Sequence, residues 1–155
     1  MNIDERGIEI LSKGYIPGPQ GAGGQIFYSS DGSAVIKLSH DPGSKVFFDF
    51  VAQASGNPHF PVMNNILSGS QWASAEIERL EELTDANIVL QKSIAENFIK
   101  NKGLLDASQF PSKLFEAIDK IKAHAVKEKC FLDITKSDNW MQRSDGTIVI
   151  SDPFT

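Results

Sequence analysis

The chain has 155 residues and a formal net charge of −5, from 15 Lys and Arg against 20 Asp and Glu. This length suits one domain and is short for two ordinary ones. The negative charge argues against a general nucleic-acid-binding protein, because neutralising phosphates requires a cationic surface. Ten Phe and a hydrophobic fraction of 41% can bury a core, so disorder is not expected.

Cysteine and histidine are scarce. The single cysteine, Cys130, excludes an internal disulfide and a Cys-rich zinc site. The three histidines are far apart and show no ligand spacing, which argues against a zinc site. The chain contains no run of about eighteen apolar residues and no N-terminal run typical of a signal peptide. We therefore expect a soluble cytoplasmic protein with no membrane contact.

The chain opens with helical spacing. Residues 3–13 place Ile3, Ile8 and Leu11 near one side and predict a short amphipathic helix, which Gly7 weakens. A segment rich in Gly and Pro follows at residues 15–24.

The rest of the first half alternates strand-like runs with one helix. Asp31-Gly32 joins the first two runs and is a strong hairpin signal. Residues 44–54 predict a helix, and Asn57-Pro58 marks a turn before the third run. Four runs are strand-like: 25–30, 33–39, 61–67 and 71–80.

The second half is helical and then ends in a hairpin. Residues 85–101 and 112–129 carry helical spacing. A loop follows, and residues 140–151 predict a second hairpin turning at Asp145-Gly146. The chain is therefore β-rich, then helical, then a polar loop leading into a late hairpin.

Three features of the sequence, taken together, indicate one type of chemistry. They are the glycine-rich turn, a lone Lys37 in the next strand, and oxygen-bearing side chains around the late hairpin, Asp133 and Asn139 before it and Asp152 after it. Phosphoryl transfer from a nucleotide needs flexible backbone over the phosphates, a cation to hold them, oxygen ligands for Mg²⁺ and a carboxylate to orient the incoming hydroxyl.

Here the sequence resembles the protein-kinase-like fold, including small bacterial and phage-borne members. The family's glycine pattern is G-x-G-x-x-G-x-V, and this chain has Pro19-Gln-Gly21-Ala-Gly23-Gly24-Gln-Ile26. With Ile26 at the valine position, Gly21 and Gly24 match the second and third glycines, and Pro19 replaces the first. The resemblance implies that Gly21, Gly23 and Gly24 contact the nucleotide.

The following strand and helix extend the resemblance. Ala34-Val35-Ile36-Lys37 resembles the V-A-I-K strand, which implies that Lys37 binds the phosphates and serves catalysis. Asp49 lies on the next helix, where the family uses Glu to pair with that lysine. Asp49 is therefore expected at the nucleotide site, as a shorter substitute for that Glu.

The late loop matches best. Residues 132–141, LDITKSDNWM, resemble H-R-D-L-x-x-x-N followed by an apolar pair. This implies Asp133 as the catalytic aspartate and Asn139 as a Mg²⁺ ligand. Residues 145–154 resemble the hairpin that runs into Asp-Phe-Gly, which implies Asp152 as a second Mg²⁺ ligand.

The chain also departs from the family pattern. Asn139 stands six positions after the catalytic aspartate, one more than usual, and Asp138 stands at the usual spacing, so either is a candidate ligand. Phe131 or Cys130 replaces the family's His, and Asp-Pro-Phe replaces Asp-Phe-Gly. The sequence stops at Thr155, where an ordinary kinase would continue with its activation segment and most of its helical lobe.

The resemblance implies an α+β fold with one kinase-like domain over residues 1–155. A five-stranded antiparallel N-lobe sheet with one C-type helix would occupy about residues 1–82. A truncated helical C-lobe ending in a β-hairpin would occupy residues 83–155. ATP and Mg²⁺ would bind between these lobes.

Each piece also has a plainer interpretation. The glycine cluster alone fits an ordinary loop, and Lys37 alone fits a solvated strand residue. Asp133, Asp138 and Asn139 fit turn and capping residues, and Asp152 with the following proline fits a strand end.

Two functions of different class follow from the resemblance. The first is an atypical minimal kinase that binds Mg-ATP and transfers phosphate to a protein hydroxyl. The second is a catalytically inactive, pseudokinase-like module of the phage or effector type, which binds and modulates a partner protein. Truncation would expose helix faces, so this second function predicts an unidentified protein partner or self-association. For a phage-encoded protein the expected location is the host cytoplasm.

Overall fold

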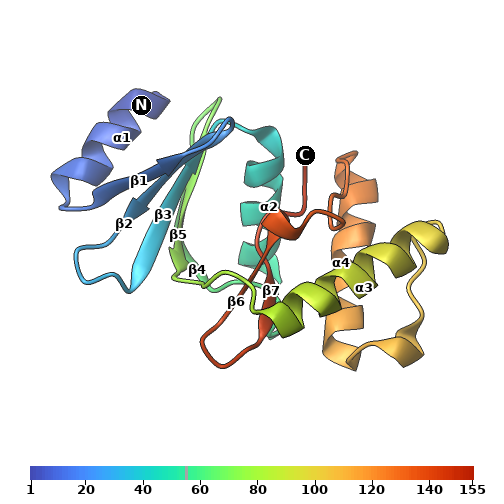
Figure 1. Ribbon diagram of the computed structural model, residues 1–155. Helices are drawn as coiled ribbons and strands as arrows, with labels where there is room; N and C mark the ends of the chain where they lie inside the picture. Colours follow the sequence, from blue (N-terminus) through green and yellow to red (C-terminus); the bar gives the residue numbers. More distant parts are fainter. Residues whose placement is uncertain (55) are drawn as a thin grey trace. The chain divides into compact units, whose positions relative to one another are not determined.

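The computed structural model describes residues 1–54 and 56–155 (Figure 1). The chain forms two compact units. The first comprises residues 1–54 and 62–79 with Thr155, and the second comprises residues 56–61 and 80–154. Among the described residues, no helix is long and apolar enough to cross a membrane.

The first unit is built on a five-stranded antiparallel sheet with strand order β1-β2-β3-β5-β4. The turn at Asp31-Gly32 connects β2 to β3 as predicted, and Gly32 has the positive φ of 73° that such turns favour in glycine. The five strands are β1 (Ile16–Gln20), β2 (Gly24–Tyr28), β3 (Ala34–Ser39), β4 (Met63–Ser68) and β5 (Ala73–Glu78).

Strand β1 is the strand that showed no strand-like pattern in the sequence. It lies inside the Gly- and Pro-rich segment at residues 15–24 and contains both Pro17 and Pro19. Proline lacks the N–H that a central strand needs, so it is tolerated at a sheet edge. β1 is one of the two edge strands, and its pairing with β2 is irregular between Pro17 and Gln20.

Two helices pack on opposite faces of this sheet (Figure 1). α1 (Ile3–Ser12) begins with a capping box, in which the Asn2 and Glu5 side chains each accept the other's backbone N–H. Its buried face joins a core cluster of Ile10, Phe27, Ile36, Leu38 and Trp72.

α2 (Pro42–Gln53) packs against β4 and β5. It begins two residues before the predicted start, because Asp41 accepts the Gly43 N–H at 2.8 Å and proline suits the first helical position.

The second unit contains two longer helices, α3 (Asp85–Lys100) and α4 (Ser112–Glu128). The short 3-10 helices η1 (Ala107–Gln109) and η2 (Ser137–Asn139) lie in the connections. Along α4 the buried positions recur at helical spacing and form its inner stripe: Leu114, Ala117, Ile118, Ile121 and Ala125.

The second unit ends in the predicted hairpin of β6 (Trp140–Gln142) and β7 (Ile148–Ile150). Residues 56–61 are bonded to this hairpin. The Arg143 guanidinium donates to the carbonyls of Pro58 and Phe60, and the His59 Nδ1–H donates to the Ile148 carbonyl at 2.8 Å. The predicted fold class is thus confirmed: an α+β chain with a five-stranded antiparallel sheet and helices that lead into a β-hairpin.

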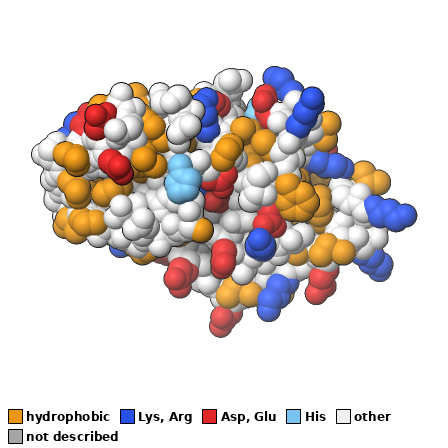
Figure 2. All heavy atoms as spheres, turned by 90° about the horizontal axis from the view of Figure 1, so that it is seen from above, with side chains coloured by type: hydrophobic (Ala, Val, Ile, Leu, Met, Phe, Trp, Pro, Cys, Tyr) orange, Lys and Arg blue, Asp and Glu red, His pale blue; other side chains and the backbone are white. Residues whose placement is uncertain are grey.

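The surface is mixed in character. On the face seen in Figure 2, acidic and basic side chains are interspersed, with apolar side chains between them. Such mixing is typical of a solvated protein surface.

Candidate functional site

The glycine-rich turn joins β1 to β2 in the first unit. The Gly21 N–H donates to the Gly24 carbonyl at 2.8 Å and closes the turn. The Gly23 carbonyl accepts from the His40 N–H at 2.9 Å and from the Ser39 hydroxyl at 2.8 Å. The turn is therefore bonded to the end of β3.

The three predicted nucleotide-binding glycines differ in what surrounds them. A Cβ at Gly24 would overlap the carbonyl oxygen of Leu38, and one at Gly23 would lie 3.3 Å from the Cβ of Asp41. A Cβ at Gly21 would meet nothing closer than the Gly24 carbonyl oxygen at 3.9 Å. Packing thus accounts for Gly24 and, in part, for Gly23, whereas it leaves Gly21 unexplained.

Lys37 lies in the middle of β3, paired with Ile26 of β2 and Ala75 of β5. Side chains alternate along a strand, so Lys37 shares a face with Ser39, whose hydroxyl contacts the Ser44 hydroxyl of α2 at 3.1 Å. Lys37 is thus on the α2 side of the sheet and is half-buried.

Asp49 lies on α2, where its carboxylate pairs with Lys45 one turn earlier at 3.2 Å. Both side chains are about half exposed, so this pair contributes little to stability. The family-like pairing of Asp49 with Lys37 stays a prediction.

In the second unit, Asp133 is buried, with 5% of its surface exposed. Its carboxylate forms an ion pair with the Lys136 ammonium at 3.1 Å and accepts from the Thr135 hydroxyl at 3.4 Å. The carboxylate therefore stands beside a cation and a hydroxyl of its own loop.

The backbone of this loop is held by three side chains. The Asn139 amide donates to the Asp133 carbonyl at 2.7 Å, and the Trp140 indole donates to the Ile134 carbonyl at 2.9 Å. Gln91 of α3 donates to the carbonyls of Ile134 at 3.4 Å and Thr135 at 3.0 Å. Three consecutive carbonyls therefore each have a side-chain donor.

The segment containing Asp152 is bonded to the same loop. The Asn139 carbonyl accepts from the Ser151 and Asp152 N–H groups at 2.9 and 3.4 Å, and the Asp133 N–H donates to the Pro153 carbonyl at 2.7 Å. Oδ1 of Asp152 is buried. The structure thus brings Asp133, Asn139 and Asp152 into one hydrogen-bonded cluster.

The side chains of Asn139 and Asp138 differ in this cluster. The Asn139 Nδ2 faces the Asp133 carbonyl, so its Oδ1 is the end that remains to accept or to ligate. Asp138 is exposed in η2, with no hydrogen bond or ion pair to its side chain from the described residues. The six-residue spacing does not separate Asn139 from Asp133, because η2 folds the intervening residues into a tight turn.

Oxygen donors of this kind suit a hard divalent cation. Over residues 1–54 and 56–155, no three His, Cys, Asp or Glu side chains gather into a metal-binding group. The expected ligands are the Asp152 carboxylate together with either the Asn139 amide or the Asp138 carboxylate. Hard cations such as Mg²⁺ keep several waters and often take only one or two protein carboxylates.

Sequence reasoning missed Gln91 and Lys136. The Gln91 side chain is only 2% exposed. Helical spacing places it on the same face of α3 as Ile88 and Ile94. A polar residue on an apolar stripe was the available signal, since a buried amide needs partners. Lys136 carried no signal, because a lysine in a polar loop is common.

Comparisons with known proteins leave the family open. No family model and no curated protein matches this chain. Solved structures do match, and among them a co-crystal structure of WbdD with the kinase inhibitor LY294002 aligns at 13% identity and a TM-score of 0.43. The alignment covers 86% of this chain and 31% of WbdD, so the chain spans about a third of that protein.

Proposed function

We propose that this protein binds Mg-ATP and transfers the γ-phosphate to a protein hydroxyl. One observation supports this most. The loop that carries the Asp133 carboxylate is hydrogen-bonded through Asn139 to the backbone at Asp152. Phosphoryl transfer requires a carboxylate and oxygen ligands for Mg²⁺ in one place, and these contacts hold the three candidate residues in one cluster.

The proposal assigns a role to each residue. Lys37 of the first unit holds the α- and β-phosphates, with Gly21 as the backbone that approaches them. Oδ1 of Asn139 and the Asp152 carboxylate ligate Mg²⁺, which would neutralise charge on the phosphates when bound. Asp138, exposed on η2, has no part in the site.

The transfer step uses the second-unit loop. The acceptor oxygen forms a bond to the γ-phosphorus, the bond from that phosphorus to the β–γ bridging oxygen breaks, and ADP leaves. The acceptor's proton goes to the Asp133 carboxylate. Lys136, 3.1 Å from that carboxylate, supplies positive charge next to the transferred group.

The first test is Mg²⁺-dependent ATP binding by thermal shift and calorimetry. At about a hundredfold excess over Kd, ATP should stabilise the protein by about 2.7 kcal/mol. We expect Lys37→Ala, Asp152→Asn and Asn139→Ala each to reduce binding. Asp138→Asn is the matched control and should bind as the wild type does. The metal assignment fails if Asp138→Asn weakens binding and Asn139→Ala does not.

Catalysis is tested separately by transfer of radiolabelled γ-phosphate into proteins of a cell extract. Asp133→Asn should bind ATP normally and lose transfer by about 10²-fold or more, because it removes the proton acceptor. Transfer that survives this substitution would overturn the role of Asp133.

An inactive binding module is the second candidate, and the surface beside the loop favours it. Phe131, two residues before Asp133, is 69% exposed, and Val126 near the end of α4 is 77% exposed. Exposed large apolar side chains mark interaction surfaces when they form a patch. ATP binding without transfer, together with a partner or dimer lost in Phe131→Ser, would favour this function.

A further inference from the structure

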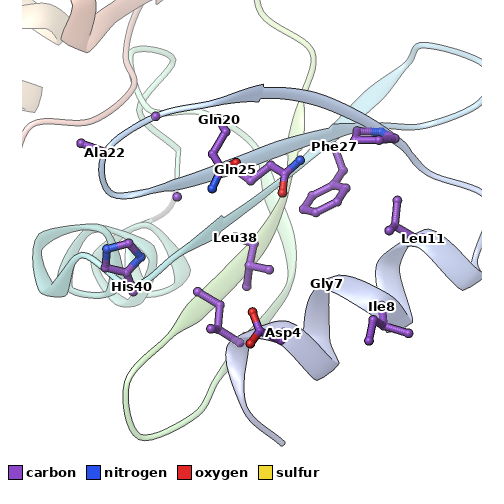
Figure 3. Close-up of a pocket in the computed structure, with 14 residues that line it drawn as sticks. Asp4, Gly7, Ile8, Leu11, Gln20, Ala22, Gln25, Phe27, Leu38 and His40 are labelled. Atoms are coloured by element: carbon purple, nitrogen blue, oxygen red, sulfur yellow. The ribbon is translucent and has the colours of Figure 1, made fainter.

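A groove lies between α1 and the first three strands, and all of its lining residues belong to the first unit (Figure 3). Its volume is about 460 Å³, which falls within the range of small-molecule pockets. Its floor is apolar, formed by the buried side chains of Phe27 and Leu38. Ile8 and Leu11 of α1 line it while 67% and 45% exposed, so a bound molecule would remove apolar surface from water.

The helical wall has a gap at its centre. Asp4, Gly7, Ile8 and Leu11 follow the spacing i, i+3, i+4, i+7 and share one face of α1. A Cβ at Gly7 would meet only the Leu38 Cδ2 at 3.8 Å, an ordinary contact. Packing does not require this glycine and helix propensity disfavours it, yet its missing side chain keeps the groove open.

The polar side chains of the groove favour a positively charged ligand. The Asp4 carboxylate lies at one end, and in the described part of the chain it has no hydrogen bond or ion pair. Gln20, Gln25 and His40 supply the other polar side chains, and no Lys or Arg is found among the described lining residues. A carboxylate without a nearby cation attracts an ammonium group and repels a phosphate.

The groove does not include Lys37, but it shares the glycine-rich turn with the proposed nucleotide site. Leu38 lines the groove, and the adjacent Lys37 faces the opposite side of the sheet because side chains alternate along β3. Gly21 and Gly24 of the glycine-rich turn line the groove as well.

We propose that the groove binds a small organic cation, a primary amine with an apolar body. The ammonium pairs with Asp4, and the apolar body lies over Phe27 and Leu38 in the space beside Gly7. Asp4 and Leu11 are seven residues apart, about 10 Å along a helix, which matches a body of one ring and a short chain.

Three probes of one skeleton test the charge preference. They are 2-phenylethylamine, 2-phenylethanol and 3-phenylpropionate, titrated into the labelled protein and followed by amide NMR shifts. We expect shifts at Gly7, Leu11, Gln25 and Leu38, with the amine binding about tenfold more tightly than the alcohol. The carboxylate should bind most weakly.

Substitutions test the residues. Asp4→Asn should weaken the amine about tenfold, to the level of the alcohol, and Asp119→Asn on the exposed face of α4 should change nothing. Gly7→Leu should remove binding of all three probes. Gly7→Ala should raise Tm and weaken binding of the amine. This variant therefore tests the groove in a folded protein, even if the leucine variant does not fold.

The proposal is overturned if no shifts occur in the groove at saturating probe, or if the three probes bind equally. Amine binding that is unchanged in Asp4→Asn or in Gly7→Ala would also overturn it. Because ATP is absent from these titrations, they succeed or fail independently of the nucleotide proposal.

Discussion

Gly24 and Gly21 stand three residues apart in one turn, but only one of them is required by packing. A side chain at Gly24 would overlap the backbone of β3, whereas Gly21 has open space. We expect Gly24→Ala to destabilise the fold by roughly 1–3 kcal/mol, since backbone must move. Gly21→Ala should leave the unfolding free energy within about 0.5 kcal/mol of wild type.

Urea unfolding of both variants measures this difference. ATP binding then separates the two roles, because Gly21→Ala should weaken ATP binding in a protein of normal stability. Equal stability losses in the two variants would contradict the packing argument.

His59 provides a pH-dependent contribution to stability. Burial lowers the pKa of His59 below its ordinary value of 6.5, and Arg143 lowers it further, while the bond to the Ile148 carbonyl raises it. The unfolded chain therefore binds more protons just below pH 6.5, so this group lowers stability as pH falls through that window.

We expect the wild type to lose more stability than His59→Gln between about pH 7.5 and about pH 5.5. Urea midpoints of both proteins at the two pH values give the comparison. The difference cancels the contribution of carboxylates common to both. Parallel losses would show that His59 does not titrate differently on unfolding.

At the scale of elements, α3 and the loop after α4 are joined by a buried amide. Gln91 holds the carbonyls of Ile134 and Thr135, and the Thr135 carbonyl has no other donor among the bonds described for residues 1–54 and 56–155. Gln91→Leu roughly keeps the volume and leaves that partly buried carbonyl without its partner, so we expect a loss of about 1–3 kcal/mol.

The control for Gln91→Leu is Gln109→Leu, a change of the same type at an exposed position in η1. Thermal unfolding reports stability, and phosphate transfer reports the position of Asp133. We expect Gln91→Leu to reduce transfer more than ATP binding. Unchanged stability in Gln91→Leu would show that the amide does not hold the loop.

At the scale of the whole molecule, the proposed roles are shared between the two units. Lys37 and the glycine-rich turn belong to the first, and Asp133, Asn139 and Asp152 belong to the second. Variants in either unit should therefore affect the same ATP-binding measurement. If only the variants of one unit lose ATP binding, the nucleotide site is restricted to that unit.

Local patterns in the sequence determined most elements. The stripe on α4 and the turns at Asp31-Gly32 and Asp145-Gly146 depend on neighbours within a few residues, so periodicity and turn chemistry predict them. The order of glycine turn, Lys37, Asp133 and Asp152 likewise needed only the printed sequence.

Tertiary structure decided what depends on distant partners. β1 became a strand despite two prolines because it lies at a sheet edge, a position that spacing cannot reveal. Spacing left Asn139 and Asp138 as alternatives, and only the tertiary structure shows the hydrogen bond from the Asn139 amide to the Asp133 carbonyl on which the proposal for Asn139 rests. The amide of Gln91 and the groove at Gly7 emerge only after folding, since burial and cavities are properties of segments brought together in space.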